Sequence, residues 1–196
     1  SVSARADTPV ALASVAWSWL AVSIAGALPF LMTGSIAWAH FDNALFESVS
    51  GFTCTGSTIL SDIEAVPRGV LFFRSMMQWF GGMGLIVLAV AVLPALKIGG
   101  LELIANEAPG PTADRLTPRV TDTARRLWLL YGGITLAMIA ALMVVGLSPY
   151  DAASHAFTTV ATGGFSPYNA SIAHFDSLLA EFVIIVGMMF CGANFS

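Results

Sequence analysis

The chain has 196 residues, of which 57% are apolar and only 10% are charged, and its formal net charge is −4. Soluble globular proteins average about 45–50% apolar and about 25% charged residues, so this chain has too few charges to cover a water-facing surface. The composition excludes a soluble enzyme, a disordered tail and a nucleic-acid-binding protein, which would need a basic surplus. We predict an all-α integral membrane protein.

Four long apolar stretches are candidates for membrane-spanning helices, because a span needs about 20 apolar residues. In chain order they cover residues 10–32, 70–96, 127–147 and 178–196. The last stretch is still apolar where the sequence stops, so we expect this chain to be a piece of a longer protein.

Two shorter segments, residues 43–52 and 152–160, lie between the spans. A helix rises 1.5 Å per residue, so neither segment can cross about 30 Å of hydrocarbon. Each is followed by a run rich in Thr, Ser and Gly, and such backbone is tolerated at membrane depth only inside protein or beside a wet cavity. The sequence therefore predicts the order span, re-entrant half-helix, polar loop, span, and predicts it twice.

Charge patterning predicts the orientation. The basic side chains gather between the second and third spans, at Lys97, Arg115, Arg119, Arg125 and Arg126. Cytoplasmic loops are enriched in Lys and Arg, so this connection is expected in the cytoplasm. The opposite side is rich in carboxylates, which would concentrate cations near a pore mouth.

The two half-helices and their loops align at an offset of 108 positions. Gly56 then falls on Gly164, and Thr58 falls on Ser166. Identity is low, but the order of features is the same, and such a repeat implies pseudo-symmetry.

The loops, residues 53–57 and 161–165, have the composition of a site for a monovalent cation. Backbone carbonyls can replace the hydration shell of a dehydrated cation, and glycine permits the φ/ψ values that this requires. Neither loop contains an acid, which argues against a carboxylate ring for divalent ions. A structural turn between helices is the alternative, and the duplication favours an ion or solute path.

Four segments of the chain resemble a known family. The segment NALFESVSGFTCTG (43–56) resembles the first pore loop of the Trk/Ktr potassium transporter superfamily. The segments QWFGGMG (78–84), EAPGP (107–111) and HAFTTVATGGFS (155–166) are similar to the TrkH-type membrane subunit.

In that family one chain carries four helix–pore-loop–helix repeats around a single potassium-channel-like pore. The resemblance implies that this chain supplies two of the expected four. Residues 9–98 would form the first repeat, residues 99–118 a cytoplasmic linker, and residues 119–196 a second repeat cut within its last helix.

The resemblance also implies a potassium site. Gly56 and Gly164 would be the filter glycines, and the ion would meet mainly backbone carbonyls. The implied ligands are Cys54, Thr55, Gly56, Thr162, Gly163 and Gly164. The family usually has Thr where this chain has Cys54, a change that spares carbonyl coordination but not a hydroxyl contribution.

The implied function is potassium uptake across the bacterial cytoplasmic (inner) membrane by the pore-forming, multi-pass subunit of a Trk-type system. Potassium would be the permeant ion, and no cofactor is expected. Expected partners are the lipid bilayer, a second copy in a homodimer, and a cytosolic nucleotide-binding regulatory subunit of the TrkA type, contacted by the connection between Lys97 and Arg126. The alternative to potassium uptake is a broken-helix secondary transporter for a small organic solute. An enzyme is disfavoured, since neither repeat contains a nucleophilic, zinc or paired-carboxylate constellation.

Four further interpretations concern polar residues and glycines. We expect Arg74 to snorkel to the membrane interface and Glu181 to lie at that interface. Glu47 is predicted to form a buried hydrogen bond behind the filter. The glycines in residues 81–84 are predicted to permit close helix packing, with a flexible point as the alternative.

Overall fold

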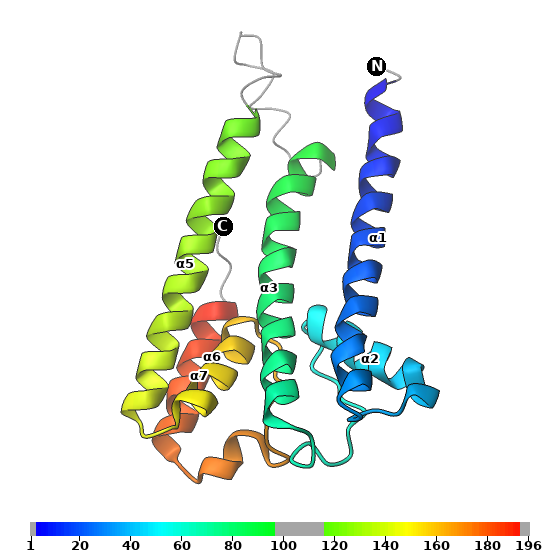
Figure 1. The fold of residues 1–196 in the computed structure, drawn as a ribbon. Coiled ribbons are helices and arrows are strands. Elements are labelled where there is room, and N and C mark those ends of the chain that lie inside the picture. The colour runs from blue at the N-terminus through cyan, green and yellow to red at the C-terminus, as the bar shows by residue number, and fades with distance from the viewer. Residues whose placement is uncertain (1–2, 97–115, 193–196) are drawn as a thin grey trace.

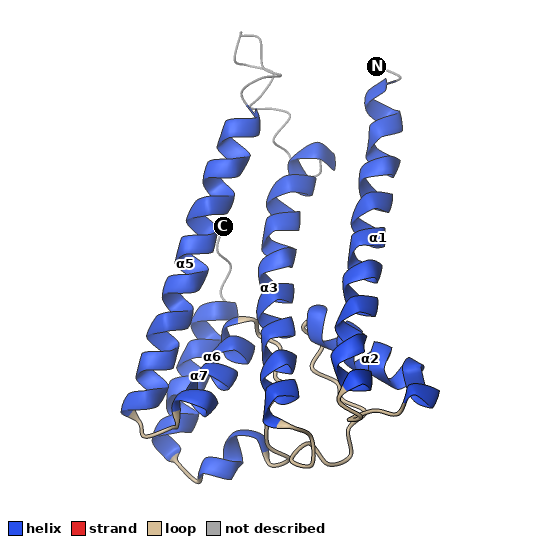
Figure 2. Ribbon diagram, viewed as in Figure 1, coloured by secondary structure: helices blue, strands red, loops and turns tan. Residues whose placement is uncertain are grey.

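The computed structural model describes residues 3–96 and 116–192, and within these ranges every regular element is helical (Figure 2). Lys97, Arg115, the segment 107–111 and residues 193–196 lie outside the described residues. Most of the connection predicted to contact a regulatory subunit is therefore outside them as well.

Six α-helices follow one another along the described chain. They are α1 (Ser3–Met32), α2 (Phe41–Phe52), α3 (Arg68–Leu96), α5 (Leu116–Val144), α6 (Pro149–Val160) and α7 (Leu178–Gly192), with 3-10 turns η1 (Trp38–His40) and η2 (Ser171–Phe175). Each predicted helix is present. The third span begins earlier than expected, since α5 starts at Leu116, and residues 116–118 of the predicted linker are helical.

Helix length separates two kinds of element. α1 has 30 residues and α3 and α5 have 29 each, so at 1.5 Å per residue each is about 45 Å long, enough to span a bilayer. α2 and α6 have 12 residues each, about 18 Å, too short to cross. Within the described residues, two helical segments meet both length and hydropathy criteria for a span, Val15–Met32 and Arg125–Val144.

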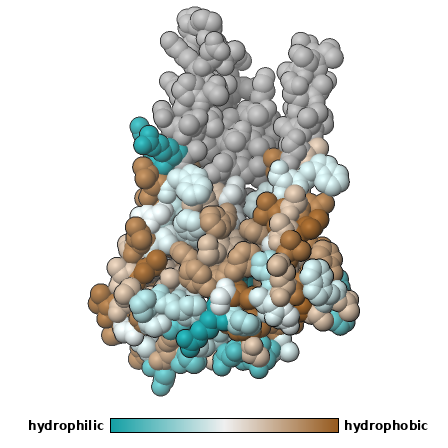
Figure 3. All heavy atoms as spheres, viewed as in Figure 1, coloured by the Kyte–Doolittle hydropathy of each residue, from teal (hydrophilic) through white to brown (hydrophobic). Residues whose placement is uncertain are grey.

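The long helices α1, α3 and α5 run side by side; the short helices α2 and α6 end partway along α3, and the connections that follow them run to one end of the molecule (Figure 1). Large apolar side chains cover much of the outer surface, with hydrophilic residues gathered at the loop end (Figure 3). Val144 and Phe182, for example, are 87% and 63% exposed. Such a continuous apolar surface fits lipid or further helices rather than water.

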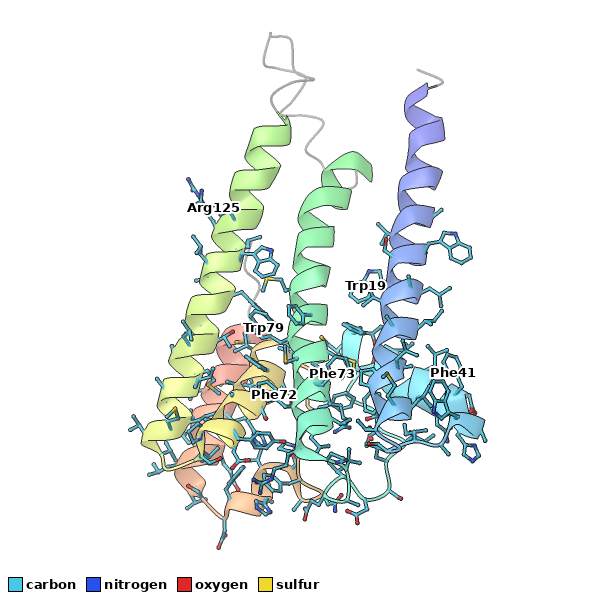
Figure 4. All side chains as sticks on the ribbon, viewed as in Figure 1. Trp19, Phe41, Phe72, Phe73, Trp79 and Arg125 are labelled. Carbon is cyan, nitrogen blue, oxygen red and sulfur yellow. The ribbon has the colours of Figure 1, made fainter. Side chains whose placement is uncertain are left out.

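α3 is the element that the two halves share. Its neighbouring residues Phe72 and Phe73 point to opposite sides (Figure 4), and their ring centroids lie 5.6 Å from Phe157 of α6 and 6.3 Å from Phe30 of α1. Met77 belongs to the apolar core of the first half and Met83 to that of the second. α3 therefore fixes the two short helices relative to each other.

The short helices start and end by local rules. Ser148 caps α6, because its Oγ accepts a hydrogen bond from the Asp151 amide at 3.2 Å, and Pro149 occupies the first turn. Both helices then end before a residue in the left-handed region, Cys54 after α2 and Thr162 after α6.

Candidate functional site

The loops after α2 and α6 have the same backbone conformation. In the first loop (residues 53–57) the left-handed residues are Cys54, φ 55°, and Gly56, φ 75°. In the second loop (residues 161–165) they are Thr162, φ 54°, and Gly164, φ 87°. Left-handed φ values are uncommon for residues other than glycine, so their recurrence at the offset of 108 makes the loops structural equivalents.

Hydrogen bonding to the preceding helix repeats as well. The Thr55 amide donates to the Ser50 carbonyl at 3.0 Å, and the Gly163 amide donates to the Thr158 carbonyl at 2.8 Å. Because these carbonyls belong to the last turns of α2 and α6, the chain leaves both helices in the same direction.

The two loops meet each other at Gly56. A Cβ atom built on Gly56 would collide with the carbonyl oxygen of Gly163, so the two backbones are in contact there. A Cβ atom on Gly164 would meet no described atom within 4 Å. The predicted site residues from the two halves are thus adjacent, and Gly164 faces open space among the described residues.

Gln78 of α3 lies against both loops. Its Oε1 accepts a hydrogen bond from the Phe165 amide at 3.1 Å, and a Cβ atom on Gly163 would collide with its amide group. The Cys54 thiol donates to the Gln78 carbonyl at 3.3 Å. The Cys54 side chain therefore turns back toward α3.

An ion pair lies behind the first loop. Glu47 of α2 and Arg74 of α3 are 0% and 1% exposed, and Arg74 Nε donates to Glu47 Oε1. The Glu47 carboxylate also accepts from the Thr58 hydroxyl and the Ile59 amide, each at 3.0 Å. The predicted buried hydrogen bonding of Glu47 is confirmed.

The prediction that Arg74 snorkels to the interface is wrong. Its guanidinium is buried, and besides Glu47 it donates to the Ser166 carbonyl at 3.2 Å and packs 3.7 Å from the centre of the Phe165 ring. The carboxylate and carbonyl oxygens replace the water that a charged group would otherwise seek. Arg74 thereby ties the first half-helix to the second loop.

His155 occupies the position in α6 that Glu47 occupies in α2. Its Nδ1 donates to the Asp151 carbonyl at 2.8 Å, and its Nε2 accepts from the Ser166 hydroxyl at 3.2 Å. The Ser166 hydroxyl also accepts from the Tyr168 amide at 3.1 Å. A neutral imidazole satisfies this network, so His155 supports the second loop without itself carrying a charge.

Further hydrogen bonds lie at the loop end, and those of Asn169 join the two halves. Asn169 donates to Asp62 Oδ1 at 2.9 Å and accepts from the Ile63 amide at 2.8 Å. The Tyr168 hydroxyl donates to Asp151 at 2.9 Å, and burial together with this hydrogen bond raises the pKa of Tyr168 to about 12. The hydrogen bond to Asp151 therefore favours the protonated phenol.

Sequence reasoning missed the contacts made by α3. Gln78 is part of a quoted motif, but its role as a partner of both loops follows only from the fold. The available signal was a polar side chain in an apolar span, one turn after Arg74. The predicted close packing is present at Gly81, where a Cβ atom would collide with the Phe52 carbonyl.

A helical chain with an apolar exterior, and with two short helices that each end in a polar loop, is typical of a membrane protein. The sequence profile of the TrkH family, described as a cation transport protein, matches residues 4–196, and the chain belongs to this family.

Individual relatives agree with that assignment. The chain is 44% identical over 179 residues to the Trk system potassium uptake protein TrkH of Vibrio parahaemolyticus and 45% identical over 178 residues to that of Escherichia coli K12. These alignments cover 91% and 90% of this chain but 37% of each relative. The chain thus spans little more than a third of the length of these relatives.

A solved structure is similar as well. The crystal structure of the potassium transporter TrkH from Vibrio parahaemolyticus matches with a TM-score of 0.77 and 39% identity, over 92% of this chain and 35% of that chain. The fold of the described helices is therefore that of the corresponding part of a TrkH membrane transporter.

Proposed function

We propose that this chain contributes the first two of four helix–pore-loop–helix repeats to a Trk-type potassium uptake protein of the bacterial cytoplasmic membrane. Residues 9–98 and 119–196 are the two repeats, and residues 99–118 are the cytoplasmic linker. The observation that carries the proposal is the pair of equivalent loops, in contact at Gly56 and the Gly163 carbonyl. The relatives are named potassium uptake proteins of Trk systems, and potassium is therefore the ion that we propose.

Potassium meets mainly backbone carbonyls in this proposal. The ligand set consists of Cys54, Thr55, Gly56, Thr162, Gly163 and Gly164. The Cys54 thiol donates to Gln78, so the carbonyl is the group left to face an ion. Carbonyl dipoles can replace the water of a dehydrating cation without binding it too tightly to leave.

The charges behind the loops support a filter of dipoles. Glu47 is paired with Arg74, and the His155 network is satisfied by the neutral ring, so neither of these two equivalent positions carries an unpaired charge. An uncompensated carboxylate at this position would favour tight binding of divalent ions over rapid passage of monovalent ones.

The assembly is part of the proposal. The complete protein is a homodimer in the inner membrane, and it binds a TrkA-type nucleotide-binding subunit on its cytoplasmic side. The naming of the relatives as components of a Trk system supports the involvement of further subunits.

Rubidium uptake tests the proposal. The full-length protein is reconstituted in liposomes, and uptake is measured with potassium or sodium as competitor. Inhibition by potassium at concentrations where sodium has no effect is the expected result. Rubidium uptake that potassium does not inhibit, or that a small organic solute blocks, would contradict the proposal and favour a broken-helix solute transporter.

A further inference from the structure

Gln78 is completely buried at the point where the two loops meet. Its side chain is 0% exposed, and it extends from the middle of α3, the helix that both halves share. Its side chain is neutral and out of reach of solvent, so its role must follow from its contacts inside the protein.

Two polar groups of Gln78 accept hydrogen bonds from the loops. The backbone carbonyl accepts from Cys54 of the first loop at 3.3 Å, and Oε1 accepts from the Phe165 amide of the second loop at 3.1 Å. The Phe165 amide follows Gly164 directly, so this bond fixes the peptide next to the second filter glycine. A single residue thus holds both loops.

The remaining group, Nε2, has no hydrogen-bond partner within the parts of the chain that the structure describes. It lies 3.8 Å from the position of a Cβ atom on Gly56, where the Gly163 carbonyl also lies. A buried donor without a partner costs about 1–3 kcal/mol, so a side chain serving packing alone would be better replaced by an apolar one of the same size. The amide therefore lies, unpaired within the described residues, at the level of the proposed ion ligands.

We infer that Gln78 is a positioning residue for potassium selectivity. Its Oε1 fixes the second loop against the first, so that carbonyls from both loops keep the spacing that suits potassium. The inference rests on the proposed function and adds to it a residue that contacts the loops without itself contacting the ion. Small displacements of carbonyls change the balance between potassium and sodium, so loss of this bond should alter selectivity more than folding.

The test replaces Gln78 by a neutral side chain of similar size in the full-length protein. Gln78→Met removes the oxygen acceptor for the Phe165 amide without adding a charge. Thr135→Val is the matched control, because Thr135 is a buried polar residue of α5 whose hydrogen bonds, in the described part of the chain, join Trp79 and Tyr131 and neither loop. Selectivity is the ratio of sodium to potassium concentrations that halve rubidium uptake.

We expect Gln78→Met to lower this ratio about fivefold to tenfold, the effect of one lost hydrogen bond, while Thr135→Val stays near wild type. An unchanged ratio in Gln78→Met, or an equal loss in Thr135→Val, would overturn the inference. If Gln78→Met does not fold, Gln78→Asn replaces it, since its shorter side chain withdraws the acceptor. Absence of potassium-sensitive uptake in the wild type would instead reject the proposed function.

Discussion

The two filter glycines of the proposed cation path differ in what surrounds them. Both have left-handed φ values, so any side chain there costs ~1–2 kcal/mol in backbone strain. Gly56 additionally touches the Gly163 carbonyl, while Gly164 has open space around it. The same substitution should therefore have unequal effects in the two loops.

We predict that Gly56→Ser lowers the preference for potassium over sodium more than Gly164→Ser does. Strain alone, at ~1.4 kcal/mol, corresponds to a tenfold change, and the collision at Gly56 adds to it. Competition of both ions with rubidium uptake measures the two variants side by side. Equal losses would show that the contact between the loops does not matter, and unchanged selectivity in both would remove these glycines from the path.

The buried ion pair makes a second prediction at this scale. Removing one partner of a buried pair leaves an uncompensated charge and costs ~3–5 kcal/mol, whereas replacing both is often nearly neutral. Arg74→Met should therefore destabilise the protein strongly, and the double variant Glu47→Gln, Arg74→Met should regain much of that loss. Thermal unfolding in detergent measures both. A double variant less stable than Arg74→Met would mean that Glu47 acts through its hydrogen bonds to Thr58 and Ile59 rather than through charge.

At the scale of helices, α3 packs closely enough on the end of α2 that one position admits only glycine. A Cβ atom on Gly81 would collide with the Phe52 backbone carbonyl, which cannot rotate away. The first loop begins directly after Phe52. Movement of α3 at this point would therefore move the loop.

We predict that Gly81→Ala lowers both thermal stability and rubidium uptake. Gly132→Ala in α5 is the control, because its Cβ atom would meet no described atom within 4 Å. Alanine favours a helix over glycine by about 1 kcal/mol, so this control should be neutral or slightly stabilising. Uptake by Gly81→Ala at the wild-type level would contradict the close packing of α3 on α2.

These elements also show what sequence can and cannot predict. The two short helices could be predicted from the sequence, because the length of each apolar segment and the polar run after it are local properties. The contacts of Arg74 do not, since its partners Glu47 and Ser166 are 27 and 92 positions away. An isolated arginine near the end of an apolar stretch looks interfacial until packing supplies a buried carboxylate.

At the scale of the whole molecule, the two halves have the same backbone conformation in their loops but different polar residues behind them. The half-helix of the first half is held by a carboxylate and a guanidinium, and that of the second by a neutral imidazole. Arg74 crosses from one half to the other to reach the Ser166 carbonyl. The two halves are therefore pseudo-symmetric in backbone, and the Arg74 side chain that joins them departs from this symmetry.

Topology gives the last prediction. Asp176 follows η2, in the connection to α7 at the loop end of the molecule (Figure 1), and Arg126 follows Arg125, which lies far along α5 toward the opposite end (Figure 4). Because basic residues favour the cytoplasmic side, the loop end should face outward. In full-length protein carrying Cys54→Thr and Cys191→Ala, a membrane-impermeant maleimide should label Asp176→Cys in intact cells and Arg126→Cys only after permeabilisation. The parent without an introduced cysteine is the control, and the reverse labelling pattern would invert the orientation and place the proposed path mouth in the cytoplasm.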